Sequence, residues 1–161
     1  MTEPEISSLL AQISKLTGLK DFTFLLAGVQ LTEKCLEPLK EFKDVPLTDF
    51  HLNLNFSNNF TDKTFEMLNE LYSVRPTIRN VDLSFSNNSH LTVQGVSQFF
   101  DKLDCLEFLE SLKFSFHASV ITRQGLTSVA KAISHQKRLQ EVVIYFIGQS
   151  RITNGDAAVC S

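Results

Sequence analysis

The chain has 161 residues, 43% of them hydrophobic and 20% charged, with a formal net charge of −3. A domain of this length can bury a sizeable core, and the weak negative charge excludes the basic footprint expected of a nucleic-acid or anionic-membrane binder. No apolar run approaches the roughly 20 residues that span a bilayer. We therefore expect no nucleic-acid partner and no membrane partner.

The compartment is indicated by the N-terminus and the cysteines. The opening MTEPEISSLL is acidic and polar, unlike a secretory signal. Cys35, Cys105 and Cys160 are odd in number and widely spaced, which fits a reducing environment. We predict an intracellular, cytoplasmic protein, with assembly in a cilium or another organelle left open.

The first predicted element is a helix within residues 1–18. Thr2 and Glu5 have the spacing of a capping box, and apolar residues follow at helical intervals from Ile6 to Leu16. Gly18 is a natural stop. Because this helix precedes the first of several repeats, we interpret residues 1–18 as an N-terminal cap that shields the core of that repeat.

Five repeats follow over residues 19–161. Each opens on an apolar residue, near positions 19, 47, 78, 109 and 139, and continues with alternating apolar and polar residues, as in VDLSF at 81–85. Period-two alternation is typical of a strand with one buried face. The fifth repeat reaches Ser161 before a full helix, so we expect it to be incomplete.

A threonine motif follows each strand. It is clearest in LTVQGV at 91–96 and ITRQGL at 121–126. Its threonine recurs every 29 to 31 residues, at Thr32, Thr61, Thr92, Thr122 and Thr153. A threonine that precedes helical spacing predicts an N-cap worth about 1 kcal/mol. The predicted helices end near Pro46, near Pro76 and near residues 135–138.

These units predict the architecture. A strand and a helix in about 30 residues cannot bury their own apolar faces, so the units must stack. We predict an α/β repeat solenoid, a horseshoe segment of about five strand–turn–helix repeats with a parallel concave sheet and outer helices. The alternative is a doubly wound three-layer α/β fold, but the repeats resemble each other in residue detail, and no glycine-rich phosphate loop follows a strand.

The strand and its turn carry a family resemblance. FSNN occurs at 56–59 and again at 85–88, and this resembles the L-x-L-S-x-N segment of leucine-rich repeats. The T-x-x-G opening of a long helix resembles the ribonuclease-inhibitor-like subclass, and the abundance of Phe and Asn is similar to that of many ciliate members. Asn59 and Asn88 are predicted to occupy the turn-asparagine position, whereas Ser119 and Gln149 replace it in later repeats and the first turn has none.

No residue set predicts catalysis or metal binding. His51 and His117 lie on strands separated by a whole repeat, roughly 9–10 Å apart, which is too far for one zinc ion. Cys35 and Cys105 fall in or near helical patterns and are interpreted as small apolar fillers. We predict that the protein is not an enzyme and that it has no cofactor, no metal and no small-molecule substrate.

Two surfaces are candidates for binding a protein. The first is the concave face, the default binding surface of a solenoid. Its predicted contact residues are His51, Asn53, Asn55, Asp82, Ser84, Lys113, Ser115 and Tyr145. The alternative interpretation is a merely solvated face, because the residues are polar and of mixed charge, with few aromatic side chains.

The second candidate is the C-terminal edge, because residues 142–147 read VVIYFI and are apolar on both faces. Val143, Tyr145 and Ile147 are its predicted contact residues. Solenoids need capped ends, so we consider three explanations: a partner or second copy covers the edge, the natural chain continues, or the tail AAVCS folds over it.

The functional prediction rests on these surfaces. We predict a non-catalytic protein–protein interaction module that serves as a structural or scaffolding subunit of a larger assembly. The alternative, implied by the family resemblance, is a regulator of an enzyme, either a nuclease inhibitor or an activator of a small GTPase. Fold analogy alone does not decide between them.

Overall fold

A computed structural model describes residues 2–75, 77–117 and 123–147. Predictions that concern Thr122, Thr153, Ser119, Gln149, Cys160, the tail and the helix of the fifth repeat lie outside these residues. The elements are α1 (Glu3–Ile13), β1 (Asp21–Leu25), η1 (Glu33–Asp44), β2 (Asp49–Asn53), α2 (Lys63–Val74), β3 (Asn80–Phe85), α3 (Val93–Asp101), η2 (Leu103–Cys105), β4 (Ser111–His117), α4 (Arg123–His135) and β5 (Glu141–Ile147).

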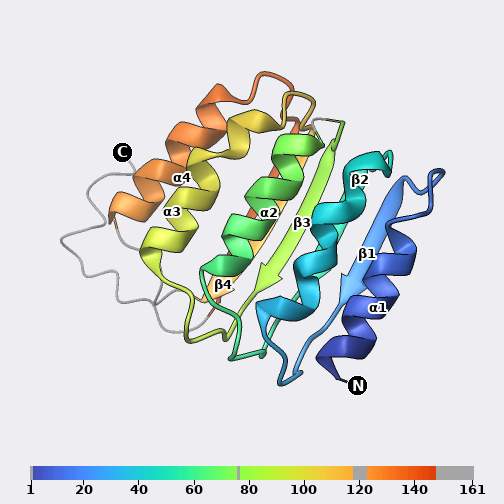
Figure 1. The fold of residues 1–161 in the computed structure, drawn as a ribbon. Coiled ribbons are helices and arrows are strands. Elements are labelled where there is room, and N and C mark those ends of the chain that lie inside the picture. The colour runs from blue at the N-terminus through green and yellow to red at the C-terminus, as the bar shows by residue number, and fades with distance from the viewer. Residues whose placement is uncertain (1, 76, 118–122, 148–161) are drawn as a thin grey trace.

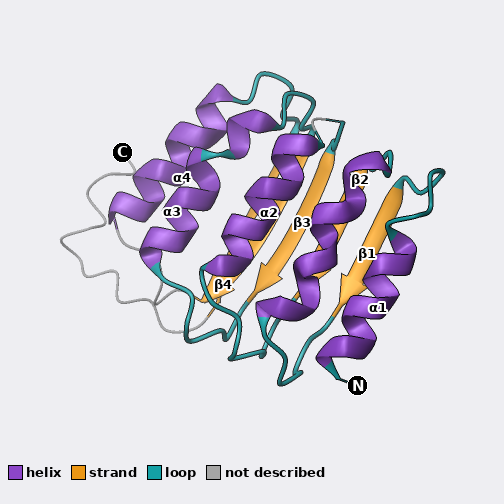
Figure 2. Cartoon of the chain, viewed as in Figure 1, coloured by secondary structure: helices purple, strands orange, loops and turns teal. Residues whose placement is uncertain are grey.

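The five strands form one parallel sheet in sequence order, β1-β2-β3-β4-β5. The pairing register displaces successive strands by 28, 31, 31 and 30 residues, and these displacements equal the spacing between the predicted repeat starts. The helices lie side by side over one face of the sheet (Figures 1 and 2). Within the described parts of the chain, every helix is too short or too polar to span a bilayer.

The core lies between the sheet and the helices. Alternate strand residues point into it, as in β3, where Val81, Leu83 and Phe85 are buried. Phenylalanine rings pack in succession here, and Phe114 contacts the rings of five others: Phe65, Phe85, Phe99, Phe100 and Phe116. These rings occupy positions at which leucine-rich repeats usually place leucine, so they fill the space between neighbouring repeats.

The N-terminal helix α1 is shorter than the sequence indicates. It ends at Ile13, where Ser14 turns its hydroxyl back to the carbonyl of Ala11. Such side-chain bonds compete with helix continuation, so Leu16 lies outside the helix and is exposed. Ile6 and Leu10 are buried, and α1 packs against η1.

The helix after the first strand is a 3₁₀ helix, η1, rather than the α-helix that the spacing suggests. Pro38 lies in its middle, has no N–H to donate, and would clash in an α-helix with the carbonyl four residues earlier. The apolar face is nevertheless as predicted, because Leu36, Leu39 and Phe42 are all buried.

The turn after each strand corrects the predicted alignment of the two FSNN segments. The register places Phe85 opposite the Leu54 position, which makes Ser57 the counterpart of Asn88. Asn88 is buried and donates from Nδ2 to the carbonyl of Leu54 at 2.8 Å, while the Ser57 hydroxyl donates to the carbonyl of Leu26 at 2.8 Å. Asn59 therefore does not occupy the turn-asparagine position. The shift also leaves Phe56 60% exposed with a positive φ of 60°.

The threonines link repeats as well as capping helices. Thr92 is the predicted N-cap of α3 and accepts from the amide of Gly95 at 3.2 Å. Its own amide and hydroxyl donate to the Asp62 carboxylate of the preceding repeat, at 2.8 and 2.5 Å. At Thr32 the hydroxyl makes no cap and instead donates to Glu3 at 2.5 Å. Before α2 the N-cap is Asp62, one residue beyond Thr61.

Candidate binding surface

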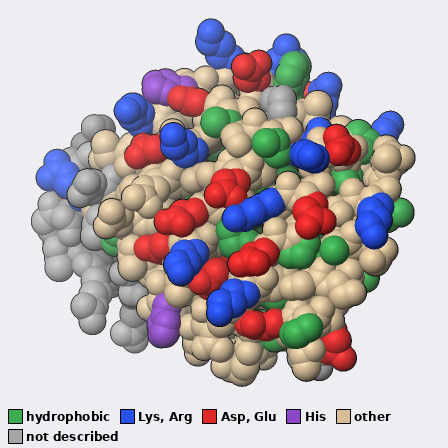
Figure 3. Space-filling model, viewed as in Figure 1, with side chains coloured by type: hydrophobic (Ala, Val, Ile, Leu, Met, Phe, Trp, Pro, Cys, Tyr) green, Lys and Arg blue, Asp and Glu red, His purple; other side chains and the backbone are tan. Residues whose placement is uncertain are grey.

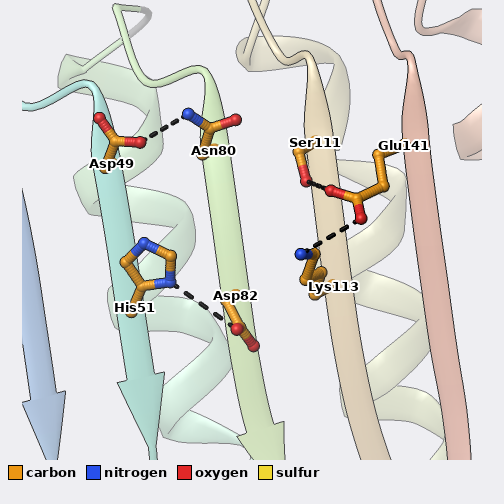
Figure 4. Close-up of polar contacts among 7 residues, drawn as sticks. All are labelled: Asp49, His51, Asn80, Asp82, Ser111, Lys113 and Glu141. Carbon is orange, nitrogen blue, oxygen red and sulfur yellow. Dashed lines mark hydrogen bonds and ion pairs between the residues drawn. The ribbon is translucent and has the colours of Figure 1, made fainter.

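The open face, defined as the side of the sheet away from the helices, carries the outward-pointing residues of all five strands. Parallel register lines these residues up in rows across the sheet. One row holds Asp21, Asp49, Asn80, Ser111 and Glu141; the next holds Thr23, His51, Asp82, Lys113 and Val143; the third holds Leu25, Asn53, Ser84, Ser115 and Tyr145. Figure 4 shows seven of these residues.

Side chains on neighbouring strands bind each other along the first two rows. Asn80 donates from Nδ2 to Asp49 Oδ1 at 2.5 Å, and Thr48 donates its hydroxyl to the other oxygen of Asp49 at 2.6 Å. His51 Nδ1 lies 3.7 Å from Asp82 Oδ2 (Figure 4). These contacts hold the polar groups of β2 and β3 in fixed positions, which is the usual role of cross-strand pairs.

A second set of contacts joins β4 to β5. Lys113 Nζ lies 3.2 Å from Glu141 Oε1, and the Ser111 hydroxyl donates to Glu141 Oε2 at 2.7 Å (Figure 4). The hydrogen bond from Ser111, followed by that from Lys113, lowers the pKa of Glu141 below its ordinary value. Glu141 is therefore charged at neutral pH and already has two partners.

Hydroxyl and amide groups cluster near the carboxyl ends of β2 to β4. Asn55 Oδ1 accepts from the Ser84 hydroxyl at 2.9 Å and from the Ser86 amide at 2.6 Å. Ser115 Oγ lies 2.7 Å from Ser84 Oγ and 3.0 Å from Ser86 Oγ. This bonding buries Ser86 and Ser115. Ser115, predicted as an accessible contact residue, is thus inside the polar cluster.

A shallow depression opens on the N-terminal half of the face. Its volume is about 360 Å³, and its lining is Thr23, Leu25, His51, Leu52, Asn53, Asp82 and Ser84. Leu25 is 66% exposed at its rim. Leu25 is not among the contact residues predicted from the sequence, because it is an exception to the polar outward positions of the other early strands.

The open face is acidic. Its outward strand positions carry four carboxylates, Asp21, Asp49, Asp82 and Glu141, against one lysine, Lys113. The helix face differs, because lysines and arginines there alternate with acidic residues (Figure 3). One such pair is Lys40 with Glu70, at 3.1 Å. The two faces therefore present different charge patterns to a partner.

The structure also places the other residues considered for chemistry. Cys35 is buried, and burial raises the pKa of its thiol to about 12, as expected of a filler. Cys105 is exposed at the end of η2, so the prediction that it fills an apolar gap is wrong. His51 lies on β2 and His117 on β4, with β3 between them. Among the described residues, no three His, Cys, Asp or Glu side chains gather into a possible metal site.

The C-terminal edge exposes a different set of residues from the predicted one. Tyr145 is 57% exposed, Val143 is half-buried, and the side chain of Ile147 lies outside the described part of the chain. Val142 and Phe146 are 41% and 44% exposed, although they occupy inward positions. The sequence pattern could not show this exposure, because the same positions are covered in every inner repeat.

Comparisons with known proteins bear on the fold. No family model matches the sequence, and no curated protein matches it significantly. Among solved structures, the chain is similar to the C-terminal domain of tropomodulin from Caenorhabditis elegans, with a TM-score of 0.64 and 16% sequence identity. The alignment covers 92% of this chain and 86% of that chain. The likeness confirms the predicted fold class, an α/β chain with five parallel strands in one sheet, similar to leucine-rich-repeat folds.

Proposed function

We propose that this protein is a non-catalytic protein-binding module that acts as a structural or scaffolding subunit of a larger assembly. The observation that carries the proposal is the open face itself, where side chains from consecutive repeats are fixed by bonds across the strands. A surface that is already ordered loses little conformational entropy when it binds, which favours recognition of a folded partner.

The charge of the open face indicates the chemistry of the partner. Four carboxylates against one lysine favour a partner that presents basic groups. Asp82 lies at the centre of the face and lines the depression that also holds Leu25. The proposed partner therefore places a cation near Asp82 and an apolar group on Leu25.

Site-specific photo-crosslinking in an extract of the native cell tests this proposal. A benzophenone amino acid replaces Lys113 on the open face or, as a matched control, Lys63 on the exposed surface of α2. We expect one discrete protein adduct from position 113, absent from position 63 and lost when Asp82→Lys is added. The captured protein is then identified and rebound in purified form.

Two results would contradict the proposal. The first is an identical set of adducts from positions 63 and 113, and the second is an adduct that persists unchanged in the Asp82→Lys variant. If the captured protein is a nuclease or a small GTPase, its rate with and without the purified chain separates a scaffold, which leaves the rate unchanged, from a regulator.

A further inference from the structure

The last described repeat exposes positions that the inner repeats bury. Register pairs Leu112, Phe114 and Phe116 of β4 with Val142, Ile144 and Phe146 of β5. The three residues of β4 are fully buried, whereas Val142 and Phe146 are exposed and Ile144 is only partly buried. The helix side of β5 therefore lacks the cover that each earlier strand receives from the next repeat.

The helix that precedes β5 shows the same difference. Val96 and Leu103, on α3 and η2, are fully buried. Their counterparts 30 residues later on α4, Leu126 and Ile133, are only partly buried. We call the resulting continuous apolar surface the C-terminal end face, made of Leu126, Ile133, Val142, Ile144 and Phe146.

The opposite end of the stack is closed. Helix α1 packs on η1, and Phe22 of β1 is buried. A head-to-tail contact between two copies would therefore join an apolar end to a covered one. Two C-terminal end faces, by contrast, are alike in character.

The outer edge of β5 is suited to pairing. Within the described residues, β5 hydrogen-bonds to β4 alone, and its sequence EVVIYFI contains neither a lysine nor a proline, the residues that usually protect an edge. Its one charged residue, Glu141, is already bonded to Ser111 and Lys113. Pairing at this edge thus brings no unpartnered charge into the contact.

We propose that the C-terminal end face binds a second copy of this chain through antiparallel pairing of the two β5 strands. A two-fold axis at Ile144 sets Val142 opposite Phe146 and Val143 opposite Tyr145, so apolar residues meet on both faces of the joined sheet. The same axis brings the two α4 helices together over the strands, with Leu126 facing Ile133. Charge and apolarity match in this arrangement without any change in either copy.

The dimer closes because it uses one end face from each copy and leaves α1 outermost at both ends. Both open faces then lie on the same side of one continuous sheet. A partner that offers two basic sites would bind such a dimer bivalently, which raises its apparent affinity without a new contact. The dimer itself does not depend on the proposed partner of the open face.

Solution mass tests the pairing directly. Light scattering or sedimentation of the purified full chain should give twice the chain mass of 18.2 kDa, falling toward that mass on dilution. Val142→Lys should abolish the dimer at concentrations where the unchanged chain dimerises. Val74→Lys is the matched control, since Val74 is a valine 46% exposed at the end of α2, and it should leave the dimer intact.

A crosslink tests the register and does not require a destabilising change. In a Cys105→Ser, Cys160→Ser background, Ile144→Cys places the two thiols on the two-fold axis, where paired strands bring Cα atoms about 4.5–5.5 Å apart. We expect a disulfide-linked dimer on oxidation, and none from Val74→Cys in the same background. A chain that is monomeric at every concentration overturns the proposal, whether another segment or another protein covers the end. A dimer that survives Val142→Lys, or that Val74→Lys removes equally, also overturns it.

Discussion

At the scale of single residues, the recurring threonine motif has a specific cause in Asp62. This carboxylate accepts both the amide and the hydroxyl of Thr92, and so binds one repeat to the next. A Cβ on Gly95 would lie 2.1 Å from Asp62 Oδ1, closer than real contacts allow. The glycine of LTVQGV therefore leaves room for the carboxylate that holds the threonine.

This geometry reverses the usual effect of a glycine substitution. Alanine in a helix is ordinarily more favourable than glycine by about 1 kcal/mol. Gly95→Ala should instead lower the free energy of unfolding by about 1–3 kcal/mol, because it displaces Asp62 and leaves the bonds to Thr92 unmade. Chemical denaturation of the two chains measures the difference.

The Asp62→Ala background supplies the control for this prediction. With the carboxylate removed, Gly95→Ala should become neutral or stabilising, giving a clear coupling in a double-mutant cycle. A loss of stability that is the same in both backgrounds would show that some other contact excludes the alanine.

The turn residues show how far the sequence could be followed at this scale. Strand alternation correctly matched Leu54 with Phe85, but the identical letters FSNN suggested a different match, which is wrong by two residues. Hydrogen bonding across the turn decides the alignment, and Ser57 does at one turn what Asn88 does at the next. A hydroxyl and an amide can serve the same carbonyl, so residue identity alone could not locate the position.

At the scale of elements, α1 is fixed to the first repeat by a carboxylate as well as by its apolar face. Glu3 accepts from the amide of Thr32 at 2.7 Å and from its hydroxyl. The hydrogen bond from the hydroxyl, and then that from the amide, lowers the pKa of Glu3 below 4.5. The charged form is thus the one that the folded cap favours.

This contact makes stability depend on pH. Because the pKa of Glu3 is lower in the folded than in the unfolded chain, its stabilising contribution is present above pH 4.5 and is lost as the pH falls through the folded pKa. Glu3→Gln should be less stable than the unchanged chain at neutral pH, and the difference should shrink below pH 4.5. Glu37→Gln, at an exposed carboxylate of η1, is the control. A gap that stays constant from neutral to acid pH would rule out the contribution of the Glu3 charge.

The elements differ in how well their sequences specify them. Strand alternation and helical spacing identified every strand and located the helices, since these patterns report burial on one face. The 3₁₀ geometry of η1 and the early end of α1 depend on Pro38 and Ser14, single residues whose local bonding overrides the spacing. The exposure of Val142 and Phe146 depends on the packing of neighbouring elements against β5, which no pattern within the strand records.

At the scale of the whole molecule, the stack has two unlike ends and two unlike faces. Helix α1 covers the first end, while the C-terminal end face exposes apolar residues. The helix face alternates in charge (Figure 3), whereas the open face is acidic and internally bonded. The repeats predicted both faces in outline, but the sign of the open face emerged only when the register placed its four carboxylates together.

Binding of a basic partner by the open face can be checked by comparing two charge reversals. Asp82→Lys on β3 and Glu66→Lys on the exposed side of α2 change the net charge equally, so long-range attraction changes alike. We predict that Asp82→Lys weakens binding of the purified partner at least ten-fold, which corresponds to about 1.4 kcal/mol, whereas Glu66→Lys changes it little. Equal weakening by the two variants, or unchanged affinity for Asp82→Lys, would contradict the proposed role of the open face.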